Sequence, residues 1–307
     1  MNLELPIFLL DWIDKDKISW NTLSRNVNAI KLLKENPDKI DWNCLSENSS
    51  KDAINLLREN PDKIDWNWLA LNPNAEAIAL LKENPDNIYW KWLSQNPNAE
   101  AISLLRANPY KISWTNLSSN PNAIDLLRTN PHEINWTYLS ANSNAIKLLK
   151  ENPDKIVWWS LSSNPNTEAI ALLKENPDKI NWKNLSRNPN AIDLLKANPD
   201  KIDWINLSYN SSKDTIKLLK ENPLKINWNW YALSSNPNAI DLLKENPDKI
   251  VWDSLSRNPS IFTYDYEKMR ENMLLFKEDL MKERFHPRNL RKFGSWGHSG
   301  GIDDDYE

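Results

Sequence analysis

The sequence predicts an all-α solenoid, because an Ile-x-Trp motif recurs 22 or 24 residues apart and two Asn-Pro signals accompany most copies. A period of this length is typical of repeat proteins, in which each unit buries its apolar face against the next. We therefore expect a superhelix of eleven units, each a pair of short helices (α plus α or 3-10). The recurring residues are Trp20, Trp42, Trp66, Trp90, Trp114, Trp136, Trp158, Trp182, Trp204, Trp228 and Trp252.

The two halves of a unit begin with related signals, Asn-Pro-Asn-Ala-Ile and Asn-Pro-Asp-Lys-Ile. An Asn side chain can accept from the free amides of a first helical turn, and Pro is tolerated at the first helical position. Both signals therefore predict helix starts. Asn also tolerates the left-handed conformation that ends helices, and the chain has no glycine before Gly294.

The apolar residues of each unit form an aliphatic and Trp wedge that only the next unit can cover. Burial of one Trp removes roughly 200 Å² from water, which is on the order of 5 kcal/mol before entropy. We expect the Trp column to be the spine of the core rather than a ligand site. In one unit the wedge consists of Ile124, Leu126, Leu127, Ile134, Trp136 and Leu139.

Four segments follow from the repeat boundaries. Residues 1–17 are a degenerate half-unit, interpreted as an N-terminal cap, and residues 18–258 are the solenoid. Residues 259–293 predict a longer amphipathic helix, interpreted as a C-terminal cap with a partner-binding helix as the alternative. Residues 294–307 contain every glycine and an acidic run, and predict a flexible tail. Stacked and capped in this way, the molecule should be elongated.

Two-residue insertions interrupt the regular spacing. Each insertion predicts a loop or an extra partial turn on one edge of the stack. One further insertion is expected between Trp228 and Asn236. The others lie between Asn48 and Ile54, Asn72 and Ile78, Asn96 and Ile102, Asn164 and Ile170, and Asn210 and Ile216.

Two polar columns repeat with the tryptophans. The Ser of Leu-Ser recurs in ten of the units, so we expect it to bond the backbone or a Trp ring nitrogen. The Asn that follows, as in Asn120, is present in every unit and is explained by helix capping. A ladder of stacked Asn amides is a further hypothesis.

Residues suited to catalysis or metal binding do not gather in the sequence. His132 lies in a repeat, whereas His286 and His298 lie beyond the array, and Cys44 is the single cysteine. No glycine loop that could hold a phosphate is present. We expect no catalytic site, no metal and no cofactor. The single cysteine also excludes a disulfide framework and indicates a reducing compartment.

Charge and hydropathy limit the partners. The net charge is −4, no basic leader precedes the first apolar residues, and no apolar run approaches 18 residues, so we expect a protein that is neither secreted nor transmembrane. A basic residue follows Leu-Leu in the complete units, which could track a nucleic-acid backbone. Because Glu usually comes next, we favour an internally paired surface, and nucleic acid is only the third alternative.

Aromatic residues at variable positions are the candidates for binding. Such residues are enriched at binding hot spots, although packing over insertions or caps is an equal alternative. The candidates for protein binding are Trp68, Trp92, Tyr138, Trp159 and Trp230. Trp68 and Trp92 share a phase in adjacent units, so we expect them to be neighbours.

The unit Leu-Ser-x-Asn-Pro-Asn-Ala-Ile-x-Leu-Leu-Lys-Glu-Asn-Pro-Asp-Lys-Ile-x-Trp, with the segments at Phe262–Tyr266 and Phe285–Arg288, resembles tandem-repeat proteins of large DNA viruses of amoebae and algae. Four units depart from it by lacking the first Pro. The resemblance implies a giant-virus protein in the host cytoplasm or the virion. The use of Asn-Pro-Asn and of alternating α and 3-10 helices is similar to leucine-rich repeat variants. The expected function is an interaction scaffold or adaptor for a host or viral protein, and the alternative is a minor capsid or capsid-associated component.

Overall fold

The computed structural model describes residues 7–222 and 228–284. It divides into two units, a helical array from Asp11 to Ile261 and a second unit that contains residues 1–10 and 262–307. The array confirms the predicted all-α repeat solenoid, with two short helices and a 3-10 turn in each regular repeat.

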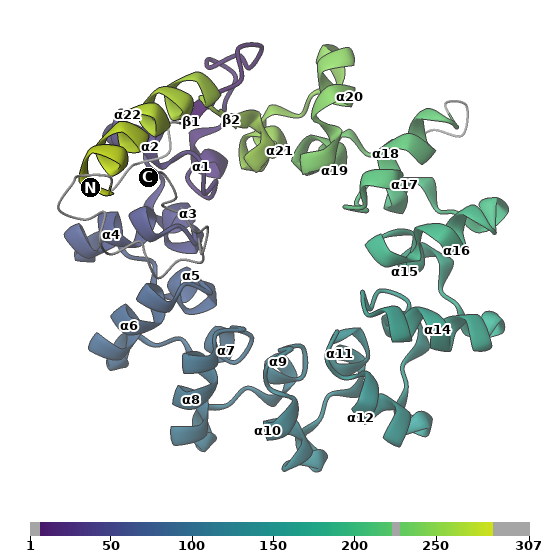
Figure 1. Ribbon diagram of the computed structural model, residues 1–307. Coiled ribbons are helices and arrows are strands. Elements are labelled where there is room, and N and C mark those ends of the chain that lie inside the picture. Colours follow the sequence, from purple (N-terminus) through teal and green to yellow (C-terminus); the bar gives the residue numbers. More distant parts are fainter. Residues whose placement is uncertain (1–6, 223–227, 285–307) are drawn as a thin grey trace, which may run out of the picture. The chain divides into compact units, whose positions relative to one another are not determined.

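The first helix of each repeat begins at the column Trp and ends near the Leu-Ser pair. In several repeats the residue before the Trp caps it, as Asp41 does by accepting from the Cys44 N–H at 2.8 Å. These helices form the inner layer of the array (Figure 1). They are α1 (Trp20–Leu23), α3 (Trp42–Glu47), α5 (Trp66–Leu71), α7 (Trp90–Leu93), α9 (Trp114–Ser118), α11 (Trp136–Ala141), α13 (Trp158–Leu161), α15 (Trp182–Ser186), α17 (Trp204–Leu207), α19 (Trp230–Ser235) and α21 (Trp252–Arg257).

The second helices form the outer layer (Figure 1). The helices in repeats with an insertion have eight or nine residues and the others five or six, so the inserted residues extend the helix at its start. This confirms the expected extra turn. The helices are α2 (Ile30–Lys34), α4 (Lys51–Glu59), α6 (Ala75–Glu83), α8 (Ala99–Ala107), α10 (Ile124–Arg128), α12 (Ile146–Glu151), α14 (Thr167–Glu175), α16 (Ile192–Lys196), α18 (Lys213–Lys220) and α20 (Ile240–Glu245).

The second Asn-Pro signal begins a 3-10 turn such as Pro37–Lys39, without a side-chain cap. The prediction that its Asn caps the following helix is wrong. The Asn36 amide donates instead to the Leu32 carbonyl at 2.9 Å, so it satisfies the end of the preceding helix. Its φ of −135° also differs from the left-handed conformation that we expected.

The fully buried apolar core consists mainly of Leu, Ile and Ala. Leu139, from the Trp-x-x-Leu motif, and Leu127, from the second helix, are 0% exposed. The column tryptophans are half-buried, which corrects their predicted role as the spine. The rings lie partly at the surface, and a lysine of the next 3-10 turn lies over the rings of Trp20, Trp42 and Trp158. Lys39 Nζ, for example, is 4.5 Å from the centre of the Trp20 ring.

The register of the tenth repeat differs from the prediction. Trp230, and not Trp228, begins the helix that contributes the buried Leu233. The Asn229 N–H donates to Ser208 Oγ at 3.1 Å, which is the bond that Asp203 makes to Ser186 one repeat earlier. The two extra residues therefore lie before the column residue Trp230. The segment from Trp230 to Asn236 has the ordinary length, so the insertion is not between the column Trp and Asn236 as predicted.

A ladder of hydrogen bonds connects the repeats. The buried Asn120 amide donates to the Ser94 carbonyl at 3.1 Å and to the Asn96 carbonyl at 2.7 Å, and its oxygen accepts from the Asn122 N–H. The equivalent Asn of each repeat donates to the Asn carbonyl of the preceding one. The ladder thus runs from amide to backbone, and the stacked-amide hypothesis is replaced.

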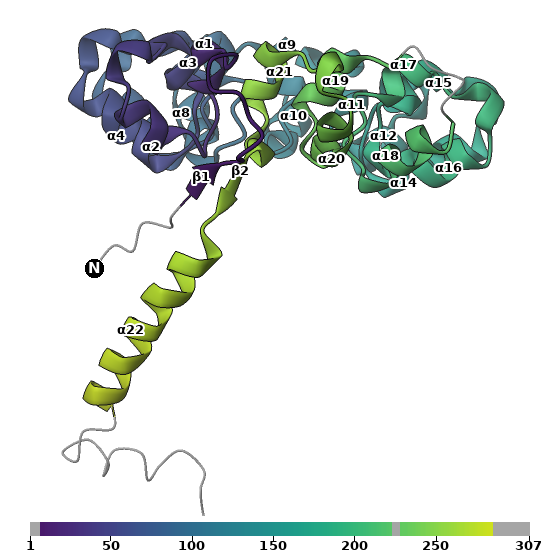
Figure 2. The same cartoon turned by 90° about the horizontal axis from the view of Figure 1, so that it is seen from above.

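The ladder closes on itself. Asn26, in the first repeat, donates to the carbonyls of Ser256 and Asn258 at 3.1 and 3.0 Å. The Ser19 N–H donates to Ser256 Oγ at 2.9 Å. The array from Asp11 to Ile261 is therefore a closed ring, with α1 beside α21 (Figure 1). Figure 2 shows the ring edge-on, with α1, α9 and α17 along one rim and α2, α4 and α14 along the other.

Closure corrects the expectation of an elongated stack with two capped ends. Residues 11–18 complete the last repeat from the other end of the chain. The Lys17 N–H donates to the Asp14 carbonyl, as Lys39 does to Asn36, and Lys17 Nζ is 5.4 Å from the centre of the Trp252 ring. The degenerate half-unit is thus the missing turn of the last repeat.

The second unit contains β1 (Ile7–Leu9), β2 (Phe262–Tyr264) and α22 (Tyr266–Arg284). The two strands pair antiparallel, with Ile7 opposite Tyr264 and Leu9 opposite Phe262. The long helix predicted within residues 259–293 is confirmed as α22, but the closed ring has no open end for it to cap. The tail at residues 294–307 lies outside the described residues. None of the helices that the structure describes is long and apolar enough to cross a membrane.

Candidate protein-binding surface

The second residue after each column Trp is placed at the junction with the preceding repeat. In several repeats it is a small polar residue that donates to a carbonyl there. Ser160 Oγ donates to the Thr137 carbonyl at 2.6 Å, and the Asn184 amide donates to the Trp159 carbonyl at 2.7 Å. This position therefore lies where two neighbouring helices of the inner layer meet.

Two consecutive repeats carry tryptophan at this position. The Trp68 and Trp92 ring centres are 4.9 Å apart with an interplanar angle of 49°, which confirms that they are neighbours. Tyr89 places its ring edge-on to Trp92 at 5.4 Å. All three side chains keep some exposed surface, and Tyr89 is 40% exposed. The result is an aromatic cluster that spans α5 and α7.

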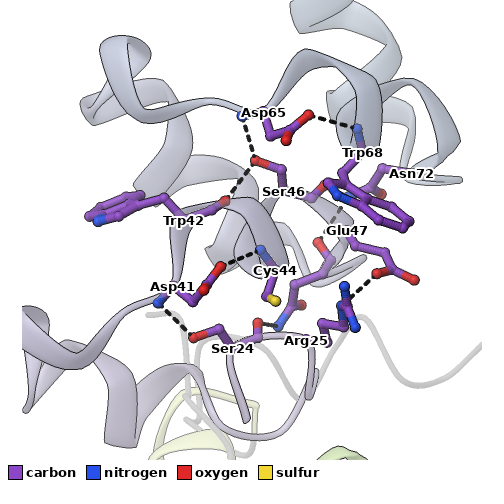
Figure 3. A network of polar contacts seen from close by, with 11 residues as sticks. Ser24, Arg25, Asp41, Trp42, Cys44, Ser46, Glu47, Asp65, Trp68 and Asn72 are labelled. Carbon is purple, nitrogen blue, oxygen red and sulfur yellow. Dashed lines mark hydrogen bonds and ion pairs between the residues drawn. The ribbon is translucent and has the colours of Figure 1, made fainter. Parts of the chain in front are cut away.

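A charged pair borders this aromatic cluster. Arg25 Nε is 2.6 Å from a Glu47 carboxylate oxygen, and the Arg25 guanidinium carbon lies 5.2 Å from the centre of the Trp68 ring. Figure 3 shows Arg25 and Glu47 facing each other beside the Trp68 indole. Contact between a guanidinium and an indole face is favourable because the ring face is negative. We name Arg25, Glu47, Trp68, Tyr89 and Trp92 the aromatic surface.

Cys44 lies beside the same pair but cannot act as a nucleophile at neutral pH. The pKa of its thiol is raised to about 11, mainly by burial; Arg25 lowers the pKa, and Asp41 and Glu47 raise it. The thiolate is the reactive form of cysteine. Cys44 is therefore mostly protonated at neutral pH, and the aromatic surface is the candidate site of this region.

The other predicted residues lie elsewhere on the ring. Tyr138 and Trp159 are 49% and 53% exposed, and they come from the adjacent helices α11 and α13. Trp230 is the column residue of its repeat, and its ring lies 5.4 Å from Trp228. Arg25 and Glu47 were missed as site residues. Their signal was available, because both occupy the variable position after Leu-Ser.

The basic residues after Leu-Leu form ion pairs between repeats of the outer layer. Arg128 bonds Glu151 of the next repeat at 2.6 Å, and this contact raises the pKa of Arg128 and lowers that of Glu151. Equivalent pairs join Arg58 to Glu83, Lys82 to Glu100, Lys150 to Glu168, Lys196 to Asp214 and Lys220 to Glu245.

No group of three or more His, Cys, Asp or Glu within residues 7–222 and 228–284 is arranged to hold a metal ion. His132 belongs to the 3-10 turn Pro131–Glu133, and His286 and His298 lie outside the described residues. Comparisons of the chain with protein-family models, with curated proteins and with solved structures found no match.

Proposed function

We propose that this chain is a non-enzymatic interaction scaffold that binds a protein partner through the aromatic surface. The observation that carries the proposal is the Trp68–Trp92 ring pair, in a position where other repeats have a small polar residue bonded to the preceding repeat. Trp, Tyr and Arg are the residue types that dominate the energy of protein interfaces. Several such residues within one junction therefore favour a protein partner.

The charge distribution favours a protein partner over a nucleic acid. A phosphate backbone needs basic groups that are free to neutralise it. Six of the basic residues after Leu-Leu are instead paired with acidic residues of the next repeat. A virion component of a large DNA virus stays a prediction from the resemblance, and the experiment below separates it from an adaptor.

The test is affinity purification of the tagged protein from cells that produce it, with quantitative mass spectrometry. The Trp68→Ala/Trp92→Ala variant should reduce recovery of the partner at least about tenfold, since hot-spot truncation costs 2 kcal/mol or more. The matched control is Tyr138→Ala/Trp159→Ala, which removes two exposed aromatics from α11 and α13. Both variants are first compared with the wild type by circular dichroism and thermal melting.

Suppose that one co-purified protein is lost with the Trp68→Ala/Trp92→Ala variant but kept with the control variant. This result would support the adaptor function and the aromatic surface as the binding surface. Equal recovery from all three proteins would contradict the proposed surface. Recovery of capsid-associated proteins alone, unchanged by either variant, would support the virion component instead. Trp68 and Trp92 would then serve only to pack neighbouring repeats together.

A further inference from the structure

Closure of the ring creates a hollow that no open array would have. Its volume is 160 Å³, and it lies where the first repeat meets the last two. Arg25 comes from the first repeat, Tyr231 from the tenth, and Asp253 and Arg257 from the eleventh. Because a water molecule takes about 30 Å³ in the liquid, the hollow has room for a small polyatomic group.

Two arginines meet in this hollow because of their phase in the repeat. Arg25 and Arg257 both occupy the position after Leu-Ser, and they become neighbours when the last repeat contacts the first. At the other junctions this position never places two basic residues side by side. The remaining occupants are Glu47, Leu71, Gln95, Ser119, Ala141, Ser163, Arg187, Tyr209 and Ser235.

One guanidinium of the hollow, that of Arg257, has no carboxylate partner among the described residues. Arg257 is exposed and forms no ion pair with any residue that the structure describes. Arg25 pairs with Glu47 through its Nε. The one carboxylate in the lining is that of Asp253, whose Oδ1 lies 3.3 Å from Thr22 Oγ1. With Glu47 counted, two guanidinium groups face two carboxylates, and Arg257 is the guanidinium that makes no ion pair with a described carboxylate.

The hydroxyl groups of Thr22 and Ser254 in the lining are already engaged within the protein. Thr22 and Ser254 point their protons at carbonyls, since Thr22 Oγ1 donates to the Asp253 carbonyl at 2.9 Å and Ser254 Oγ to the Tyr231 carbonyl at 2.6 Å. They stabilise the wall and leave ligand binding to the guanidinium groups and the Tyr231 phenol. Guanidinium forks match the paired oxygens of carboxylate and phosphate.

We propose that this hollow at the ring seam binds an oxyanion of the size of a phosphate or carboxylate group, held by Arg257 and Arg25. The site goes beyond the proposed function, because its ligand is a small anion and not a protein; the two sites share Arg25, whereas Arg257 belongs to the hollow alone. It exists only while the ring is closed, since its two arginines come from opposite ends of the array.

The test is isothermal titration of the whole protein with sodium phosphate and with sodium acetate, in sodium chloride of matched ionic strength. Arg257→Gln should weaken binding about tenfold, as expected for the loss of one charge-assisted contact. Asp253→Asn should strengthen it, because a repelling carboxylate is removed. The matched control is Arg187→Gln, at the same repeat position but stacked 4.4 Å from the centre of the Tyr209 ring.

Stronger binding of phosphate than of acetate would support the site and identify a phosphoryl group as its ligand. Equal binding of both would support it as a carboxylate site. Failure of both ions to bind above chloride, or binding that Arg257→Gln leaves unchanged while its melting temperature equals that of the wild type, would overturn the proposal.

Discussion

The seam between α21 and α1 carries the same bonds as an internal junction, although only the internal junction is covalently continuous. At the seam Asn26 donates to the carbonyls of Ser256 and Asn258, and at the junction of α9 and α11 Asn142 donates to those of Ser118 and Asn120. The comparison teaches that complementary faces, and not the chain connection, determine how repeats join. A ring closed by such faces leaves no apolar end for a cap to cover.

The largest expected effect comes from the ladder asparagines. Asn26→Ala and Asn142→Ala should each lower the free energy of unfolding by about 3 kcal/mol, because two buried carbonyls and one N–H lose their partner at about 1 kcal/mol each. The pair is well matched, since the residues are 2% and 3% exposed and neither is followed by proline. Urea denaturation measures both values.

Equal losses would show that the seam is closed in solution. A cost of about 1 kcal/mol or less for Asn26→Ala, which corresponds to the Asn28 N–H bond within its own repeat, beside the full cost for Asn142→Ala, would mean that the ring is open and that the seam bonds add nothing. Asn28→Ala is a control, because the amide of this half-buried residue donates to the Pro259 carbonyl across the same seam, in a bond that is exposed to water.

A smaller effect is expected from the serines that join consecutive repeats. Ser256 Oγ accepts from the Ser19 N–H at the seam, and Ser118 Oγ accepts from the Asn135 N–H inside the ring, both at 2.9 Å. Ser256→Ala and Ser118→Ala should each cost about 1 to 2 kcal/mol, because each hydroxyl also donates to the carbonyl of a Trp four residues earlier and two hydrogen bonds are lost. Ala70 occupies this position naturally, so the substitution fits. Differential scanning calorimetry would reveal unequal losses, which would contradict the equivalence of the two junctions.

The sequence was sufficient for the local structure of each repeat. Periodic Trp, Leu and Asn specified the helices, the insertions and the buried polar columns, because these depend on neighbours within about one period. Closure was not predictable in this way. It requires each of eleven repeats to turn by roughly 33°, and curvature depends on small rotations at every interface. No single residue carries that information.

Two local errors have equally physical causes. Trp228 and Trp230 both follow an Asn, so spacing alone could not decide which begins α19; the buried Leu233, three residues after Trp230, decides it. The aromatic surface was half predicted, because Trp68 and Trp92 share a phase. The shared position of Arg25 and Glu47 after Leu-Ser marked them as variable residues, but their contact with Trp68 depends on how far each side chain reaches and was not predicted.

The smallest expected difference concerns the rate at which the two junctions open. Cys44 occupies, at the first internal junction, the position that Thr22 occupies at the seam, and both are half-buried. Native Cys44 should react with iodoacetamide at pH 8 about a hundredfold more slowly than the unfolded chain, from its thiolate fraction alone, because its pKa is raised from 9.0 to about 11. The rate should then rise with pH up to that value.

A Thr22→Cys/Cys44→Ser variant places the probe at the seam, where it should react somewhat faster, since no covalent link restores the contact after opening. Identical rates would mean that the seam opens no more often than an internal junction, and a rate equal to that of the unfolded chain would mean that it does not close.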